Sequence, residues 1–325
     1  MPFARITAVG TYVPERVLTN YDLEKMVDTS DEWIVRRTGI RERRITADDE
    51  YTSDLCVGAF RDLTNHHHVD PADIDLIIVA TQTPDYGFPS TAARLQHLLG
   101  IPHTAAAFDL SAACAGFTYG LYMAIGLVEA GARRKALVIG ADTMSKITDY
   151  TDRTTCILFG DGAGAVIVEA AERDEPFILA SGFTTDGGGG IHVYRSGLSQ
   201  TMDGQPLKGG GYTVQNGREV YKWAVTEVSS GIASLLQSCG LSEQELDWFI
   251  PHGANMRMLE SICEKSRISA ERMLTCVDRY GNTSAASIPL ALAPAVRDGR
   301  IRQGHRVLLY GFGAGLVACG LLVRW

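Results

Sequence analysis

The sequence predicts an α/β protein of two similar halves, and three observations support this fold class. Apolar runs that suit buried strands alternate with segments of helical periodicity. The second half of the chain weakly repeats the first. The chain has 325 residues, 46% of them hydrophobic, which is enough to bury one large core or two similar ones.

The first half shows the alternation most clearly. Residues 5–12 predict a first strand, short helices are expected after Thr19 and Thr29, and 52–65 has helical periodicity. Continuous apolar strands flanked by helices are typical of a parallel or mixed sheet covered on both faces. Such a pattern continues as a strand at 74–81, a helix at 91–99, a strand at 105–110, a helix at 116–130, and strands at 136–141 and 162–170.

The internal repeat is visible in three short matches. Asp75 in Ile-Asp-Leu-Ile-Ile-Val corresponds to Asp247 in Leu-Asp-Trp-Phe-Ile-Pro, an offset of 172 residues (247 − 75). We therefore expect two halves, 1–172 and 173–325, with a shared crevice where the ends of corresponding elements meet. The other two matches join 137–140 to 308–311 at an offset of 171 (311 − 140), and 162–166 to 313–317 at 151 (313 − 162).

Composition and charge exclude several classes of function. The net charge of −8 argues against a general nucleic-acid surface, which would be basic. Seven widely spaced cysteines without a Cys-x-x-Cys motif indicate a reducing compartment and neither a disulfide framework nor a zinc site. The run His66–His68 predicts a helix end, because adjacent residues do not converge on one metal ion. No signal peptide and no apolar run of about 18 residues is visible, so we expect a cytoplasmic protein that binds no membrane.

The segment Phe108–Gly120 contains the candidate nucleophile, Cys114. This cysteine follows a predicted strand and three small residues, and it precedes an apolar helix that carries no charge until Glu129. A cysteine at such a turn lies at the positive end of the helix dipole, which favours the thiolate and lowers the thiol pKa. On this segment alone, the alternative is a buried structural cysteine that packs as a small hydrophobic residue.

Two further polar side chains are expected to meet Cys114. His252 follows a predicted buried strand and corresponds to the carboxyl end of the strand at 79–81, where α/β sheets place their sites. Asn282 lies in 278–287, which we interpret as an internal copy of the strand-turn-helix around Cys114, at offsets of 169 (278 − 109) and 168 (282 − 114). Alone, His252 is equally well a core histidine and Asn282 an N-cap. Together, the three side chains predict one catalytic crevice.

Two polar segments are expected to border this crevice. The glycine-rich stretch Asp186–Gly211 lacks the strand and helix start of a dinucleotide or P-loop site, so it predicts a long excursion over the site. A long helix at 215–237 follows it. The arginine-rich segment 36–44 fits either a solvated loop or, beside Trp33, a place for a base and its phosphates.

These motifs resemble those of the β-ketoacyl-acyl-carrier-protein synthase III family, the initiating condensing enzymes of bacterial fatty-acid synthesis, in the thiolase-like superfamily. The resemblance implies a thiolase-like αβαβα fold and a homodimer. It implies an acyltransferase that loads an acyl group from acyl-coenzyme A onto Cys114 and condenses it with malonyl-acyl carrier protein, with loss of CO₂. Coenzyme A thioesters are then substrates, and no cofactor is expected. The resemblance runs from Arg5 to Trp325 and is most specific at 29–43, 112–119, 159–164 and 281–287.

The resemblance also implies a role for particular residues. Cys114 would accept the acyl group, while neutral His252 and the Asn282 amide donate hydrogen bonds to the enolate that decarboxylation leaves. A carboxylate in place of Asn282 would repel that charge. The remaining roles are adenine stacking by Trp33 and Arg153, polar contacts of coenzyme A with Arg37 and Thr38, a pantetheine contact by Asn255, an acyl pocket of Ile157, Phe312 and Phe88 (the last across a dimer interface), and carrier-protein contacts by Lys222 and Arg257.

Three positions depart from the family pattern. Gly253 replaces the usual glutamine and loosens the backbone, Arg218 stands where asparagine is common, and Ala314 interrupts a glycine run although it does not take a positive φ cheaply. The acyl primer (acetyl, branched or longer) stays open. Also open are a specialised condensing enzyme that forms a β-keto acid, a Cys–His thioester hydrolase and a non-catalytic carrier-protein scaffold.

Overall fold

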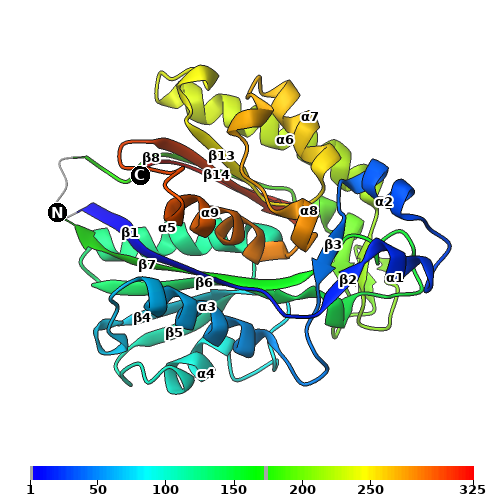
Figure 1. Ribbon diagram of the computed structural model, residues 1–325, viewed down its shortest axis with the longest axis horizontal. Helices are drawn as coiled ribbons and strands as arrows, with labels where there is room; N and C mark the ends of the chain where they lie inside the picture. The colour runs from blue at the N-terminus through cyan, green and yellow to red at the C-terminus, as the bar shows by residue number, and fades with distance from the viewer. Residues whose placement is uncertain (1–2, 172–174) are drawn as a thin grey trace.

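The computed structural model describes residues 3–171 and 175–325. Within this part of the chain, a first mixed sheet has five strands in the order β1-β7-β6-β4-β5 (Figure 1). The strands β4, β5 and β6 are parallel, and β7 is antiparallel to both of its neighbours. These strands are β1 (Phe3–Tyr12), β4 (Leu76–Ala80), β5 (Ala106–Leu110), β6 (Lys135–Thr143) and β7 (Asp161–Ala171).

A second, four-stranded sheet has the order β13-β14-β15-β8. Its strands β13 and β14 are parallel, and the other pairs are antiparallel. The predicted boundary at residue 172 lies outside the described residues. The strands of this sheet are β8 (Ile178–Thr185), β13 (Trp248–Pro251), β14 (Arg306–Gly313) and β15 (Val317–Arg324).

Helices lie in three layers, outside and between the two sheets (Figure 1). Helices α3 (Thr52–His66) and α4 (Thr91–Leu98) cover the outer face of the first sheet. Helices α6 (Gly217–Ser238) and α7 (Met256–Lys265) cover the second. The middle layer contains α5 (Gly116–Glu129) and α9 (Ser287–Arg297), which are mostly buried, as their largely apolar sequences predict. This is the predicted αβαβα arrangement.

The two halves repeat each other at the level of single residue pairs. The parallel pair Leu76–Ala136 of the first sheet corresponds to Trp248–Val307 of the second, at offsets of 172 (248 − 76) and 171 (307 − 136). The 3₁₀ turns η2 (Ala113–Ala115) and η7 (Ser284–Ala286) each lead directly into a middle helix, again 171 residues apart (284 − 113). The structural counterpart of Cys114 is therefore Ala285, and Asn282 lies three residues before it. Our alignment of 278–287 was wrong, because the short helix α8 (Val277–Tyr280) forms where the copy of β5 was expected.

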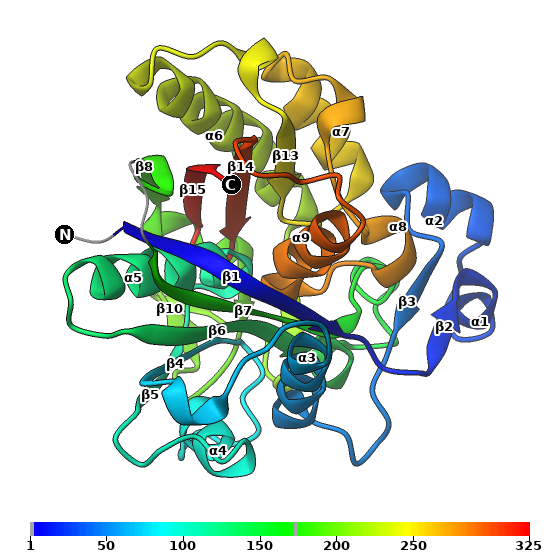
Figure 2. The ribbon, with the colours of Figure 1, turned by 60° about the vertical axis from the view of Figure 1, so that its left-hand side comes forward.

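Two excursions leave this layered core. Helices α1 (Asn20–Glu24) and α2 (Asp31–Thr38) project to one side of the main sheets, beside α7 and α8 (Figure 2). The antiparallel pair of β2 (Val17–Thr19) and β3 (Glu42–Arg44) projects with them. In the described residues no helix is long and apolar enough to cross a membrane. The glycine-rich excursion forms η4 (Gly187–His192) and the short strands β9 (Val193–Arg195), β10 (Thr201–Met202), β11 (Gln205–Pro206) and β12 (Thr213–Gln215).

Candidate active site

A cavity of about 810 Å³ opens between the two halves and the excursions. Cys114, His252 and Asn282 all line it, so the structure brings the three predicted catalytic residues together. Ile157 and Phe312 line it as well. Further wall residues are mostly apolar, and a mouth rich in arginine is formed by Arg36, Arg37, Arg195, Arg218 and Arg257.

Cys114 is presented by a tight turn between β5 and α5. Ala113 takes the left-handed conformation, with φ of 47°, and the chain then enters η2 and the helix. The turn of β14 packs directly against the cysteine: a Cβ on Gly313 would lie 2.9 Å from the Cys114 Cβ. Such contacts do not occur between real side chains, so a glycine is required at 313.

Burial, and not the helix start, dominates the ionisation of Cys114. It raises the pKa of the thiol to about 12, the nearby Ser284 side chain opposes this, and the carboxylate of Asp142 adds to the rise. Our expectation of a lowered pKa is therefore wrong. The turn points the half-buried cysteine into the cavity, where a thiolate loses part of its hydration. The resting nucleophile is the neutral thiol, and its proton must leave as the sulfur attacks.

His252 follows β13 directly, as predicted, and is 2% exposed. Its backbone N–H donates to the Tyr310 carbonyl at 2.9 Å, and the edge of its ring meets Phe312 with centroids 5.2 Å apart. Its Nδ1 lies 2.8 Å from the Ser287 Oγ. Burial lowers the pKa of His252 to about 3, so the ring is neutral at physiological pH. A neutral ring acts as a hydrogen-bond donor or acceptor, but not as a cation.

Asn282 is fixed by hydrogen bonds that define which end of its amide is free. Its Oδ1 accepts from the Ser284 backbone N–H at 2.9 Å. Its own backbone N–H donates to the Leu158 carbonyl at 2.8 Å, and its carbonyl accepts from the Gly160 N–H at 3.1 Å. Since the oxygen is occupied by a donor, the amide nitrogen is the end available to a ligand.

Two buried charged residues support the site and were not predicted. The Asp142 carboxylate accepts from the Ala285 N–H at 3.3 Å and from the Gln82 N–H at 2.6 Å, which ties the turn after Asn282 to the first sheet. Arg43 is fully buried, and its Nη2 donates to the Ile157 carbonyl at 2.7 Å, behind the cavity wall. Burial lowers the pKa of Arg43 to about 10. The solvated-loop interpretation of 36–44 is thus wrong for Arg43, which its sequence neighbours do not distinguish from the exposed arginines.

Trp33 stands at the mouth of the cavity with two arginines beside it. The guanidinium of Arg153 lies 5.0 Å from the Trp33 ring centroid, and that of Arg37 lies 5.8 Å from it. A base stacked between Trp33 and Arg153 needs about 7 Å, twice a van der Waals contact of about 3.5 Å, so Arg153 must move outward to admit one. Thr38 lines the cavity but uses its hydroxyl within the chain, donating to the Ile34 carbonyl at 2.7 Å.

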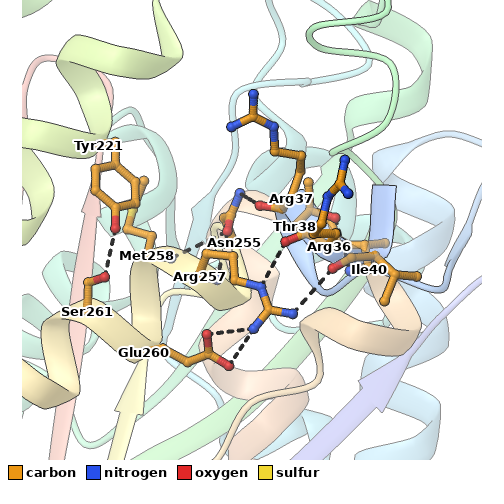
Figure 3. A network of polar contacts seen from close by, with 11 residues as sticks. Arg36, Arg37, Thr38, Ile40, Tyr221, Asn255, Arg257, Met258, Glu260 and Ser261 are labelled. Carbon is orange, nitrogen blue, oxygen red and sulfur yellow. Dashed lines mark hydrogen bonds and ion pairs between the residues drawn. The ribbon is translucent and has the colours of Figure 1, made fainter. Parts of the chain in front are cut away.

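The first turn of α7 docks on the last turn of α2 (Figure 3). Asn255 is the N-cap of α7, and its Nδ2 donates to the Arg37 carbonyl at 3.4 Å. Arg257 donates to the Arg36 carbonyl at 3.1 Å, to the Val35 carbonyl at 3.4 Å, and to Glu260 at 2.7 and 2.9 Å. The guanidinium of Arg257 therefore forms hydrogen bonds within the protein. The sequence did not reveal these contacts.

The predicted residues that lie outside the cavity lining are Phe88, Arg153 and Lys222. Phe88 is 91% exposed, and Lys222 is on the exposed face of α6. Val193, Tyr194 and Arg195 of the glycine-rich excursion do border the cavity.

The three departures have different consequences. A Cβ on Gly253 would meet Ser287 and Val277 at 3.4 and 3.5 Å, which are ordinary contacts, and Gly253 does not line the cavity. Ala314 lines the cavity, and its φ is not positive. The residue with a positive φ in this turn is Gly315, at 141°. Arg218 adds an exposed cation to the mouth.

Comparison with known proteins agrees with this geometry. The family model of 3-oxoacyl-[acyl-carrier-protein] synthase III matches residues 108–187, and the model of its C-terminal part matches 236–325. A β-ketoacyl-[acyl-carrier-protein] synthase III 2 of Halalkalibacterium halodurans is 57% identical over 322 residues, which cover 99% of this chain and 96% of the relative. The chain belongs to the β-ketoacyl-acyl-carrier-protein synthase III family.

Other members of the family resemble this synthase III over its whole length. The synthase III 2 of Bacillus subtilis is 54% identical over 325 residues, covering 100% of this chain and 99% of the relative. The crystal structure of the synthase III of Thermus thermophilus matches with a TM-score of 0.94 and 45% identity, covering 98% of each chain. The predictions of the family, the thiolase-like fold and a condensing acyltransferase are confirmed.

Proposed function

We propose that this synthase III transfers an acyl group from acyl-coenzyme A to Cys114 and condenses it with malonyl-acyl carrier protein, which starts fatty-acid synthesis. The observation that carries this proposal is the meeting of a cysteine with two neutral hydrogen-bond donors, His252 and Asn282, in one cavity. In the first step the Cys114 sulfur attacks the thioester carbonyl, and the thiol proton leaves through the His252 lone pair. Coenzyme A departs as its thiol with that proton, and the acyl group stays on Cys114.

The second step uses His252 and Asn282 as hydrogen-bond donors. Loss of CO₂ from the malonyl thioester leaves negative charge on its thioester oxygen, and the carbon of this enolate attacks the acyl carbonyl. The acyl–sulfur bond then breaks, and Cys114 leaves as a thiolate that takes a proton from water to return to the thiol. His252 is neutral, and the Asn282 nitrogen is its free end, so both suit hydrogen-bond donation to that oxygen. One preorganised donor of this kind is typically worth about 2.7–4 kcal/mol of barrier.

The mouth of the cavity suits a coenzyme A thioester. Trp33 offers a face for adenine, Arg37 and Arg153 offer positive charge beside it, and Asn255 lies on the path to Cys114. Lys222 remains a proposed contact for the acidic carrier protein because it is exposed on α6 near this mouth. We propose the same for Arg257, with the added role inside the chain described above.

We also propose a homodimer in the cytoplasm. The strand β5 is an edge of the first sheet, and its residues are only half buried in one chain. An unpaired edge strand beside exposed aromatic residues favours association. In a dimer, Phe88 would reach the acyl pocket of the partner subunit. Size-exclusion chromatography with light scattering tests this: one peak at twice the 35.2 kDa chain mass is expected, and a monomer contradicts it.

Intact mass spectrometry tests the proposed reaction. We expect an acyl mass increment when the protein is mixed with a panel of acyl-coenzyme A thioesters, and its loss in Cys114→Ala. Malonyl-acyl carrier protein should then remove the increment and yield a β-ketoacyl product. The thioester that loads best identifies the primer. An adduct that only hydrolyses favours a thioester hydrolase, a free β-keto acid product favours the specialised condensing enzyme, and the absence of any adduct favours a scaffold.

A further inference from the structure

The carboxylate of Asp142 is fully buried between the two halves of the molecule. In the described residues it accepts hydrogen bonds from two threonine hydroxyls and two backbone N–H groups, and none of these donors carries a charge. Burial of a carboxylate costs folding free energy, which hydrogen bonds or a cation must offset. A charge at this place therefore needs an explanation beyond packing.

The two oxygens of Asp142 have different partners. Oδ1 accepts from three donors just after β4: the Thr81 hydroxyl at 3.0 Å, the Gln82 N–H at 2.6 Å and the Thr83 hydroxyl at 3.0 Å. Oδ2 accepts from the Ala285 N–H at 3.3 Å, in the turn η7. One side chain thus connects the end of a strand in the first half to the turn of the second half that follows Asn282.

The turn η7 has a backbone conformation that its surroundings must hold. Ser284 has a φ of 50°, in the left-handed region that a residue with a side chain rarely takes. Its N–H donates to the Asn282 Oδ1, and the next N–H, that of Ala285, donates to Asp142. Two successive N–H groups of one turn therefore have one partner in the site and one in the other half of the molecule.

We propose that Asp142 is a positioning residue whose carboxylate holds η7 in the conformation that aims the Asn282 amide nitrogen at the enolate. This role rests on the proposed function, because it concerns the decarboxylation step. Asp142 does not line the cavity, so it does not touch a substrate. The backbone N–H of His252 is bound to the Tyr310 carbonyl, and Cys114 is presented by η2, so acyl transfer should depend on Asp142 much less.

Separate assays of the two half-reactions test the proposal with Asp142→Asn, which replaces one oxygen by an NH₂ group. The amide oxygen should take the place of Oδ1 with its three donors, which turns the NH₂ group toward the Ala285 N–H and leaves two donors facing each other. We expect CO₂ release from malonyl-acyl carrier protein by the pre-acylated protein to fall by about 100-fold, the cost of displacing a catalytic group by about 1 Å. The single-turnover acyl increment on Cys114 should stay within about 3-fold of wild type.

A double-mutant cycle distinguishes this role from a structural one. If Asp142 acts through Asn282, then adding Asp142→Asn to Asn282→Ala should lower CO₂ release by less than about 3-fold further. Asp161→Asn is the matched control: Asp161 is also fully buried, and in the described residues its carboxylate accepts from Thr46 and Ser145, both in the first half. This control should leave both half-reactions unchanged.

Several outcomes would overturn the proposal. These are equal losses of both half-reactions in Asp142→Asn, no loss in either, an undiminished loss when Asp142→Asn is added to Asn282→Ala, or the same loss in Asp161→Asn. If Asp142→Asn does not fold, Thr81→Val removes one donor and keeps the charge, so CO₂ release should fall by about fivefold, while Thr81→Ser keeps the wild-type rate. Equal rates in the two Thr81 variants would overturn the proposal. If the wild-type protein itself forms no acyl adduct, the proposed function has failed instead.

The contact with Ala285 can also be observed without turnover. Labelling with ¹³C′-serine and ¹⁵N-alanine restricts an HNCO spectrum to Ser–Ala pairs, of which the sequence has three, at 111–112, 269–270 and 284–285. Ala285→Gly removes, and so assigns, the signal of interest. We expect the Ala285 amide proton to resonate downfield, as a donor to a carboxylate does, and to move upfield in Asp142→Asn while the signal of 269–270 stays in place. An unchanged Ala285 signal would overturn the proposal even if activity changed.

Discussion

The Cys114 thiol experiences two opposing influences, the start of a helical turn and burial. Burial is the larger, and it raises the pKa to about 12. Cysteines with low pKa values lie at helix N-termini or beside a cation or a metal. The charged group that acts on Cys114 is the Asp142 carboxylate, which raises the pKa further. Cys114 is therefore activated in the course of the reaction and not beforehand.

The pH dependence of alkylation follows from this pKa. Iodoacetamide reacts with the thiolate, so the rate of Cys114 modification should rise by about tenfold for each pH unit from 6 to 9, without a plateau. Intact mass measured over time gives the rate, and Cys114→Ala corrects for the other cysteines. A plateau reached near pH 7 would indicate a preformed thiolate.

The buried neutral state of His252 makes stability depend on pH in a defined window. Above its unfolded pKa of about 6.5 the ring is neutral in both states, so it contributes no slope. Between pH 6.5 and the native pKa of about 3, the unfolded state binds a proton that the native state does not, so stability falls as pH falls. At pH 5 the loss is about 2 kcal/mol.

Urea unfolding at pH 7 and pH 5 measures this contribution. His252→Gln removes the titrating group. Between pH 7 and pH 5, the free energy of unfolding of the wild type should therefore fall by about 2 kcal/mol more than that of the variant. An equal decrease in both proteins would place the His252 pKa near its ordinary value.

At the scale of elements, the contact between α2 and α7 shapes the mouth of the cavity. Helix α2 carries Trp33 and Arg37, and its last carbonyls accept hydrogen bonds from Arg257 and Asn255 (Figure 3). A cation at the C-terminal end of a helix also interacts favourably with the helix dipole. The side chain of Arg257 is 44% exposed, so water weakens its electrostatic interactions. Its hydrogen bonds still fix the position of α7 against α2.

Loss of Arg257 should therefore act on coenzyme A binding. In Arg257→Ala we expect the KM for acyl-coenzyme A to rise by about tenfold, equivalent to about 1.4 kcal/mol. Acyl transfer from a short acyl thioester without the adenine should be unchanged. Lys222→Ala, on the exposed face of α6, is the matched control and should leave the KM for acyl-coenzyme A unchanged. A rise confined to the KM for malonyl-acyl carrier protein would show that Arg257 acts only on that partner.

The sequence predicts helices and strands best in long segments with a regular pattern of apolar residues, and least well in short turns. The strand expected at 136–141 is β6 (Lys135–Thr143), and the helix expected at 215–237 is α6 (Gly217–Ser238). The segment before Asn282 was misassigned because four residues carry too little periodicity to distinguish a helical turn from a strand. Asp142 and Arg43 were missed because burial of a charge depends on partners from distant segments.

At the scale of the whole molecule, the repeat places the nucleophile in one half and its two partners in the other. The turns η2 and η7 lie against each other between the sheets, so Cys114 and Asn282 reach one cavity although they are far apart in the chain. The motifs and the repeat predicted this convergence. They did not reveal the hydrogen bond between Asn282 and Ser284 that leaves the amide nitrogen free, because it depends on the shape of the turn.

The central claim is that a neutral pair of donors stabilises an enolate, and the rate of CO₂ release from malonyl-acyl carrier protein tests it most directly. Asn282→Asp keeps an oxygen that can accept from the Ser284 N–H but places negative charge at the enolate. We predict that Asn282→Asp slows CO₂ release by at least about 100-fold and releases CO₂ more slowly than the neutral variant Asn282→Ala. Cys114 should still accept an acyl group in both variants. Release by Asn282→Asp at the wild-type rate would contradict the account.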